Sequence, residues 1–228
     1  MVRVLAVADE TVESFWRSKA RDVAPDLVVA AGDLPWDYVE FIASSVDVPV
    51  VFVPGNHDPE VATSRVSRSG LHTVAGLPCD APRPHGVTHL DGHVADLAGL
   101  RIAGLGGCVR YRPGPHQYSQ REYRGRLRRL ARRVRRHDRR SPGGLDLLVT
   151  HAPPLGLGDG DDGPHVGIEA LVPFLLEVQP TWHLHGHIHP YGRTMPDRTL
   201  GRTTLRNVIP YRVLEIEPLT AGLPVRVG

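Results

Sequence analysis

Metal-binding and acid–base side chains meet in one short motif, Gly55-Asn56-His57-Asp58, which directly follows a β-branched run at residues 48–53. Such a run predicts a buried strand, so an amide oxygen, an imidazole and a carboxylate share one tight turn at its end. Parallel α/β sheets build their sites at the carboxyl ends of strands. The motif is therefore a candidate site if other segments of the chain supply partners for it.

Partners of the right chemistry follow the other apolar runs. Six potential ligands lie at predicted strand ends: Asp9, Asp33, Asn56, His151, His187 and His189. Oxygen and imidazole donors together suit divalent ions such as Mn, Fe, Co, Ni or Zn. In an extended segment, His187 and His189 share one face because Ile188 separates them. A single Asp after a strand is often only a cap, but six such residues together favour a metal site.

The elements that position these residues begin as alternating strands and helices. Strands are predicted at residues 2–8, 26–31 and 48–53, with amphipathic helices at 11–24 and 36–46 between them. Right-handed crossovers make these strands parallel. Their polar carboxyl-terminal residues then meet at one edge of the sheet.

The rest of the chain is less regular. Short alternating stretches predict antiparallel strands with tight turns at residues 87–90, 93–97 and 100–105, and residues 106–117 predict an ordered loop. A strand at 145–149 and a helix at 166–178 follow. Two alternating stretches, 203–209 and 211–216, predict a closing hairpin or a sheet edge. Without repeats or linkers, one domain over residues 1–228 is expected.

Residues 121–140 form a predicted helix with eleven arginines, whose apolar residues recur at helical spacing on one face. Two interpretations are open. The arginines form a solvated face in a chain that uses Arg almost exclusively, since Lys19 is its one lysine, or they bind an anionic surface such as nucleic acid or lipid. We favour the first interpretation.

Composition predicts an ordinary globular protein, with 41% apolar and 23% charged residues. A net charge of +2 does not imply a polyanionic partner. Cys79 and Cys108 form neither a metal motif nor a disulfide framework, which predicts a reducing, cytoplasmic location. No apolar run reaches the roughly 18 residues of a membrane span, and a strand that begins at residue 2 leaves no room for a signal peptide.

Four segments carry a family resemblance: Gly32-Asp33, Gly55-Asn56-His57-Asp58, Thr150-His151 and Gly186-His187-Ile188-His189. In type and order they resemble four of the five motifs of calcineurin-like metallophosphoesterases, over roughly residues 9–190. The resemblance implies an α/β fold, a four-layer α/β/β/α sandwich of two mixed sheets flanked by helices. It also implies a two-metal site on top of the sheets.

The resemblance also implies residue roles. Asp33 would bridge two divalent transition-metal ions, with manganese favoured. Asn56, His151 and His187 would complete the second ion's ligands, and Asp9 and His189 would bind the first. His57 would contact the scissile phosphate and protonate the leaving oxygen, with Asp58 orienting its ring.

The implied chemistry is the hydrolysis of phosphate esters. Two cations lower the pKa of a shared water and so supply a metal-bound hydroxide near neutral pH, and an imidazole is suited to general-acid work. We expect a metallophosphoesterase, a phosphodiesterase or phosphatase, that acts on phosphodiesters of small or nucleotide-like substrates. The chain leaves little length for a DNA-binding domain, so nucleic acid is not expected as a partner. Arg110, Tyr111 and Arg112 suit an anionic or planar group, or are simply exposed.

One motif departs from the family pattern, because Asp9-Glu10-Thr11 stands in place of Asp-x-His. The missing imidazole belongs to the first ion. Water or Thr11 can fill its place and leave a weaker site, or Glu10 or His185 can substitute. Alternatively the first ion is lost, leaving a one-metal enzyme or a non-catalytic relative that binds phosphorylated ligands. The retained catalytic and metal-binding residues favour an active enzyme.

Overall fold

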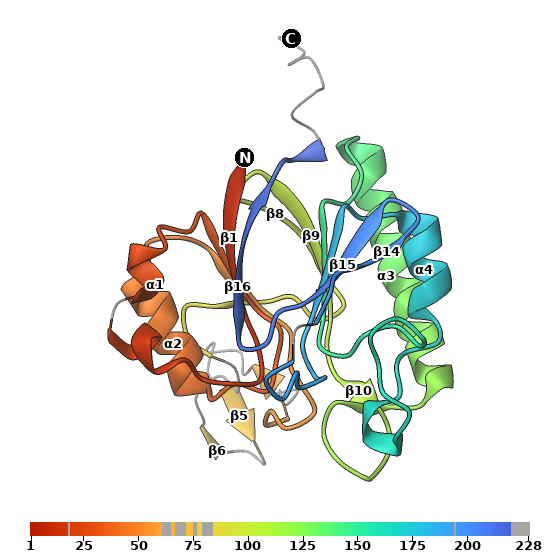
Figure 1. Cartoon of the computed structure of the whole chain (residues 1–228), viewed down its shortest axis with the longest axis horizontal. Coiled ribbons are helices and arrows are strands. Elements are labelled where there is room, and N and C mark those ends of the chain that lie inside the picture. The colour runs from red at the N-terminus through yellow and green to blue at the C-terminus, as the bar shows by residue number, and fades with distance from the viewer. Residues whose placement is uncertain are drawn as a thin grey trace.

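Two facing β-sheets, each covered by helices on its outer side, build the framework of the protein (Figure 1). The computed structural model describes residues 1–17, 19–60, 65–66, 72–74, 77–78, 84–193 and 195–219. α1 and α2 lie on one side of the paired sheets, and α3 and α4 lie on the other. This arrangement is the predicted four-layer α/β/β/α sandwich.

The first sheet has five strands, in the order β16 (Tyr211–Ile216), β1 (Val2–Val7), β2 (Leu27–Ala30), β3 (Val50–Phe52) and β7 (Thr88–His89). All neighbours are parallel except β16, which pairs antiparallel with β1. The predicted parallel order of the first three strands is confirmed, so their carboxyl ends share one edge.

The second sheet has six strands, in the order β14 (Arg198–Leu200), β15 (Thr203–Asn207), β13 (Trp182–His185), β12 (Leu147–Thr150), β9 (Leu100–Leu105) and β8 (Val94–Leu97). The four inner strands are parallel, and both edge strands run antiparallel to their neighbours. The predicted turn at Ala98-Gly99 joins β8 to β9, and both of its residues have positive φ.

Helices and smaller elements complete the fold. The main helices are α1 (Lys19–Asp22), α2 (Trp36–Ser45), α3 (Gln120–Arg140) and α4 (Leu171–Val178), with 3-10 turns η1 (Glu13–Arg17) and η2 (Gly163–His165). β10 (Cys108–Val109) pairs with β11 (Gln117–Tyr118) around the predicted ordered loop. A small sheet contains β4 (Arg65–Val66), β5 (His72–Val74) and β6 (Leu77–Pro78). Cys79 lies outside the described residues.

The structure corrects the predicted strand direction and turn at residues 87–92, and it decides between the two alternatives for the last two strands. β7 is parallel to β3 in the first sheet, so Asp91-Gly92 connects the two sheets instead of closing a hairpin. β15 and β16 are not a hairpin, because the apolar residues Val208 and Ile209 between them are buried in the space between the sheets. β16 does form a sheet edge, as the alternative prediction had it.

Two helices are also shorter than predicted. The helix expected at 11–24 is divided into η1 and α1, which bury Phe15 and Ala20 and leave Trp16 partly exposed. α4 begins at Leu171 because Ile168 is held in a parallel bridge with Pro154. The apolar residue Ile168 fits the helical spacing of the sequence, but in the structure it packs from an extended segment before the helix.

Successive side chains along the central strands point to opposite faces of the sheet, so they pack in different layers of the core. Val4 and Ala6 of β1 face the second sheet, whereas Leu5 and Val7 face the helices on the other side. Both sets are almost fully buried, as expected for a parallel strand covered on both faces. The central strands are therefore fixed from both sides, and so are the polar residues at their ends.

The arginine-rich helix α3 begins with a reciprocal capping box. Ser119 accepts a hydrogen bond from the backbone of Glu122, and the Glu122 side chain accepts one from the backbone of Ser119. Its apolar stripe packs against the second sheet. Ten of its eleven arginines are exposed, and whether they bind an anionic partner stays a prediction. Within the described residues, no helix has the length and apolar character needed to cross a bilayer.

Arg126 is the exception among these arginines because it is largely buried. It forms an ion pair with Asp91, donates a 2.9 Å hydrogen bond to the carbonyl of Gly106 and lies 3.8 Å from the centre of the Tyr118 ring. The contacts join α3 to the loop that follows β9.

We expect Arg126→Ala to lower the free energy of unfolding by about 2 kcal/mol, because it leaves the carboxylate of Asp91 without its charged partner. The matched change Arg128→Ala, on an exposed side chain of the same helix, should stay within about 0.5 kcal/mol. Urea denaturation of both variants measures the difference. Equal effects would contradict a specific role for Arg126.

Candidate metal centre

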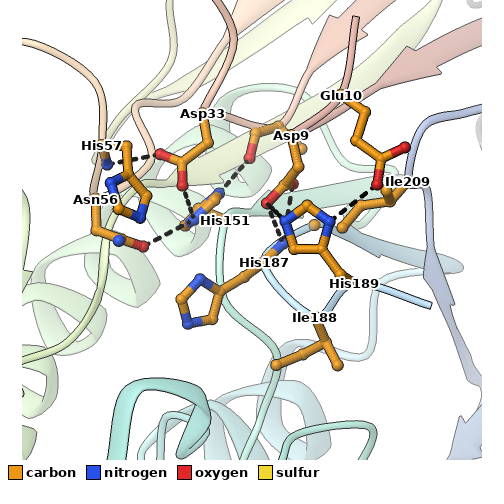
Figure 2. Close-up of polar contacts among 12 residues, drawn as sticks. Asp9, Glu10, Asp33, Asn56, His57, His151, His187, Ile188, His189 and Ile209 are labelled. Carbon is orange, nitrogen blue, oxygen red and sulfur yellow. Dashed lines mark hydrogen bonds and ion pairs between the residues drawn. The ribbon is translucent and has the colours of Figure 1, made fainter. Parts of the chain in front are cut away.

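All six predicted ligands lie together where strands of the two sheets end (Figure 2). Ligand atoms of Asp33, His151 and His187 lie within 4.8 Å of one another. Asn56 approaches His151, and the carboxylate of Asp9 contacts both His187 and His189. Asp9 and His189 are distant in the sequence, but they meet because they follow strands of two sheets that face each other.

Three of these residues have a left-handed backbone conformation, which sets the direction of their side chains. Asp9, Asp33 and His187 have φ values of 60°, 55° and 68°, which non-glycine residues seldom adopt. Such conformations persist where surrounding contacts impose them, and they concentrate at functional sites. Here the backbone N–H of Asp33 donates to the carboxylate of Asp58, and that of His187 donates to Asp9. The turns at Asp33 and His187 are thus each held by a carboxylate of another motif, and the backbone N–H of Asp9 donates to the carbonyl of Gly32.

The glycines of two motifs make room for the carboxylates. A Cβ atom on Gly55 would lie 2.0 Å from Oδ1 of Asp33, and one on Gly186 would lie 2.2 Å from Oδ2 of Asp9. Either contact would force the carboxylate to move. The requirement for glycine at these positions is therefore steric and concerns the placement of Asp33 and Asp9.

Three potential ligand atoms converge at the second ion's expected position. His151 is fully buried, and its Nδ1 lies 2.8 Å from the carbonyl of Ala31 and must donate to it. Its Nε2 faces two oxygens, Oδ1 of Asn56 at 3.1 Å and Oδ2 of Asp33 at 3.4 Å. A ring nitrogen between two oxygens requires positive charge, which a proton or a metal ion can supply.

The pKa values report the same need for positive charge. Burial alone would lower the pKa of His151, but the neighbouring carboxylate of Asp33 raises it to about 10. Burial would likewise raise the pKa of Asp33, but His151 more than offsets this and lowers it to about 2. Burial and the charge of His151 lower the pKa of His187 to about 3, so His187 is neutral. Because its Nε2 donates to the carbonyl of Pro164, its Nδ1 is free to bind an ion. The donors fit a divalent transition metal.

The first ion's expected position has fewer donors. The Asp9 side chain is 3% exposed, and its Oδ1 lies 3.8 Å from Nε2 of His189. Thr11 is exposed. His185, one of the suggested substitutes, contacts the carbonyl of Gly186 and the ring of His183, not Asp9 or His189. Glu10, the other suggestion, lies 2.9 Å from Nδ1 of His189.

We expect metal binding to release protons in a pH-dependent way. At pH 7.5, His151 with a pKa of about 10 holds a proton that an ion must displace, so about one proton should leave. Burial raises the pKa of Asp9 to about 6. Its carboxyl group therefore adds to the release as pH falls, toward about two protons near pH 5.5. Calorimetry in buffers of different ionisation enthalpy counts these protons, and a release that does not change with pH would contradict the assignment.

The predicted general acid, His57, is exposed beside the cluster, and its backbone N–H donates to Oδ1 of Asp33 at 2.7 Å. Asp58 was expected to orient the ring of His57. In the structure its carboxylate accepts hydrogen bonds from the backbone N–H groups of Gly55 and Asp33. These contacts place the turn that carries His57, and the role of each residue in catalysis stays a prediction.

Side chains around the site were only partly foreseen. The hydroxyl of Tyr111 lies 3.4 Å from Nδ2 of Asn56, so Tyr111 lies beside the cluster. Arg110 forms an ion pair with Glu122 and is used in the fold. The carbonyls of Ala31 and Pro164 fix the rings of His151 and His187, and no side-chain pattern in the sequence could have identified them.

A two-sheet sandwich with carboxylates and imidazoles at its strand ends is the architecture of the metallophosphoesterases. A family model described as calcineurin-like phosphoesterase matches residues 7–191. The chain therefore belongs to this family.

Named relatives match only short segments. A UPF0046 protein of Caenorhabditis elegans is 45% identical over 56 residues, 23% of this chain and 14% of that protein. Metallophosphoesterase domain-containing protein 1 of Homo sapiens is 43% identical over 61 residues, 25% of this chain and 19% of that protein. The matches thus cover less than a fifth of these relatives' own length. A Thermus thermophilus protein of known structure shares the fold, with a TM-score of 0.57 at 14% identity over 90% of this chain and 87% of that one.

Proposed function

We propose that this protein hydrolyses phosphodiesters of small or nucleotide-like substrates with two divalent ions, manganese favoured. One observation carries the proposal. The buried Nε2 of His151 and the oxygens of Asp33 and Asn56 converge on one point, and the exposed His57 stands directly beside it. The first feature favours a cation and the second can reach a substrate.

Each residue has a proposed role set by its position. Asp33 would be shared by the two ions, Asn56, His151 and His187 would hold the second ion, and Asp9 and His189 would hold the first. When bound, the ions would activate a water and neutralise the negative charge of the phosphate. The Asp33 carboxylate also accepts the backbone N–H of His57, so it fixes the position of that residue relative to the centre.

His57 is proposed as the general acid. An exposed imidazole can give a proton to the leaving oxygen near neutral pH and regain it from solvent. Asp58, 5% exposed, is a positioning residue that holds the turn through the backbone of Gly55 and Asp33. Tyr111 beside Asn56, and Arg112, whose guanidinium lies 5.3 Å from the centre of the Tyr111 ring, are available for the planar or anionic part of a substrate.

The test is metal content together with turnover. The protein is loaded with Mn, excess ion is removed, and bound metal is counted by elemental analysis. Hydrolysis of bis(p-nitrophenyl) phosphate is then compared with that of p-nitrophenyl phosphate. Two bound ions with faster diester turnover support the proposal. Two ions without hydrolysis of either ester would reject it.

A second candidate is a non-catalytic or one-metal protein that binds phosphorylated ligands. The exposed Thr11 in place of the family histidine favours it, because the first ion would then have one imidazole fewer among its ligands. One bound ion per chain, with phosphate binding but no turnover, would support this candidate.

A further inference from the structure

Glu10 contacts the one histidine of the first ion's expected position. We propose that Glu10 is a positioning residue that holds the ring of His189 so that its Nε2 faces Asp9 and the first ion. The inference rests on the proposed two-metal centre and concerns how this chain maintains its first site without the family's usual histidine.

The three imidazoles of the centre share one arrangement, in which one ring nitrogen is bound to an acceptor outside the expected ligands. Nδ1 of His151 lies 2.8 Å from the carbonyl of Ala31, and Nε2 of His187 lies 2.9 Å from that of Pro164. Metal-binding histidines usually donate their other ring N–H in this way, which fixes the tautomer and the ring orientation. His189 follows the same rule, but its acceptor is a carboxylate.

The geometry distinguishes a positioning role from direct coordination. Oε1 of Glu10 lies 2.9 Å from Nδ1 of His189, while Nε2 lies 3.8 Å from Oδ1 of Asp9. Figure 2 shows the His189 ring between the two carboxylates. An ion shared by Nε2 and Asp9 would therefore lie on the side of the ring away from Glu10. A carboxylate acceptor keeps the proton on Nδ1 and leaves the lone pair of Nε2 directed at the ion.

A carboxylate behind the imidazole also changes its strength as a ligand. It makes the ring a stronger electron donor than a carbonyl acceptor does. The second ion's histidines use carbonyls, whereas the site that has lost an imidazole has a carboxylate behind its remaining one. The side chains of Glu10 and His189 are 49% and 34% exposed, so the effect should be moderate.

The test compares Mn(II) affinity in Glu10→Ala, Glu10→Gln and the control Glu13→Gln. Glu13 is a nearby, exposed carboxylate that pairs with Arg17. Electron paramagnetic resonance of free Mn(II) resolves the weaker and the tighter ion. Glu10→Ala should raise the Kd of the weaker ion by about 10-fold, the lower end of the range for such contacts, and leave the tighter ion unchanged. Glu10→Gln should raise this Kd less, because the amide oxygen can still accept a hydrogen bond from Nδ1 of His189.

A second measurement reads the mechanism directly. Nitrogen-detected NMR of the metal-free protein should show His189 with its proton on Nδ1 in the wild type and in Glu13→Gln, and a tautomer mixture in Glu10→Ala. The melting temperature should be alike in all variants, because Glu10 is an exposed side chain.

Two results would overturn the role of Glu10. If the wild type binds two ions and Glu10→Ala binds both as tightly, Glu10 does not position a ligand, while the proposed function stands. If Glu10→Gln loses the weaker ion as fully as Glu10→Ala, Glu10 is a direct ligand. A wild type that binds only one ion rejects the two-metal centre itself.

Discussion

Replacing Asp33 by asparagine should abolish hydrolysis and remove the tighter ion. The change keeps the shape of the side chain and the acceptor that receives the backbone N–H of His57. It removes the negative charge 3.4 Å from Nε2 of His151, which is the charge that draws a cation to this point. Loss of an outer contact commonly costs 10- to 100-fold in affinity, so loss of a charged ligand should cost at least about 100-fold.

The matched control is Asp37→Asn, an exposed carboxylate at the start of α2 whose acceptor role an amide can keep. It should bind two ions and turn over like the wild type. Elemental analysis gives metal content, and NMR of the metal-free Asp33→Asn protein should show a lower pKa for His151. Full metal content in Asp33→Asn would mean that the cation does not bind where the oxygens of Asp33 and Asn56 converge.

The strength of the Asp33 effect follows from the dry environment of the pair. The His151 side chain is fully buried and that of Asp33 is 9% exposed, so their charges are poorly screened by water. The two carboxylate oxygens of Asp33 therefore have different roles. One oxygen faces the expected ion, and the other holds the backbone of the residue proposed to act as the acid.

Much of the site was predictable because strand ends are readable in the sequence. The runs before Asp9, Asp33 and Asn56 are apolar apart from Arg3, which is typical of parallel strands buried on both faces. Once the strands are parallel, their ends share an edge and the ligands converge. The same logic placed His151 at the end of β12 and His187 just beyond β13.

The errors arose where local pattern does not determine the partner. β15 and β16 each alternate like hairpin strands, yet they join different sheets because Val208 and Ile209 fill the space between the sheets. β7 is only two residues long and takes its direction from its neighbour β3. Strand pairing of this kind depends on contacts distant in sequence, which periodicity does not record.

The contacts that orient the ligand side chains could not be predicted from the sequence, for another reason. Backbone carbonyls, such as those of Ala31 and Pro164, carry no residue-type signal. Asp58 was recognisable as part of a motif, but its partners are backbone amides of its own turn and of Asp33. Proximity in the sequence identified Glu10, whereas its place behind His189 required the structure.

His57→Ala should retain both ions and lose turnover. The variant keeps the backbone N–H that donates to Asp33, and it removes only an exposed ring. Removing a general acid costs about 100- to 10,000-fold in rate. The exposed histidine His93, on the connection between the two sheets, provides the control variant His93→Ala, which should turn over normally.

The leaving group separates proton donation from other roles of His57. An alkoxide leaving group needs a proton as it departs, so an alkyl phosphodiester should show the full loss in His57→Ala. A p-nitrophenolate departs as a stable anion, so its ester should lose much less. If both esters lose the same factor, His57 acts by binding the phosphate and not as an acid. Because the ring is exposed and its backbone is anchored to Asp33, a change in metal content would instead mean that the turn at residues 55–58 has moved.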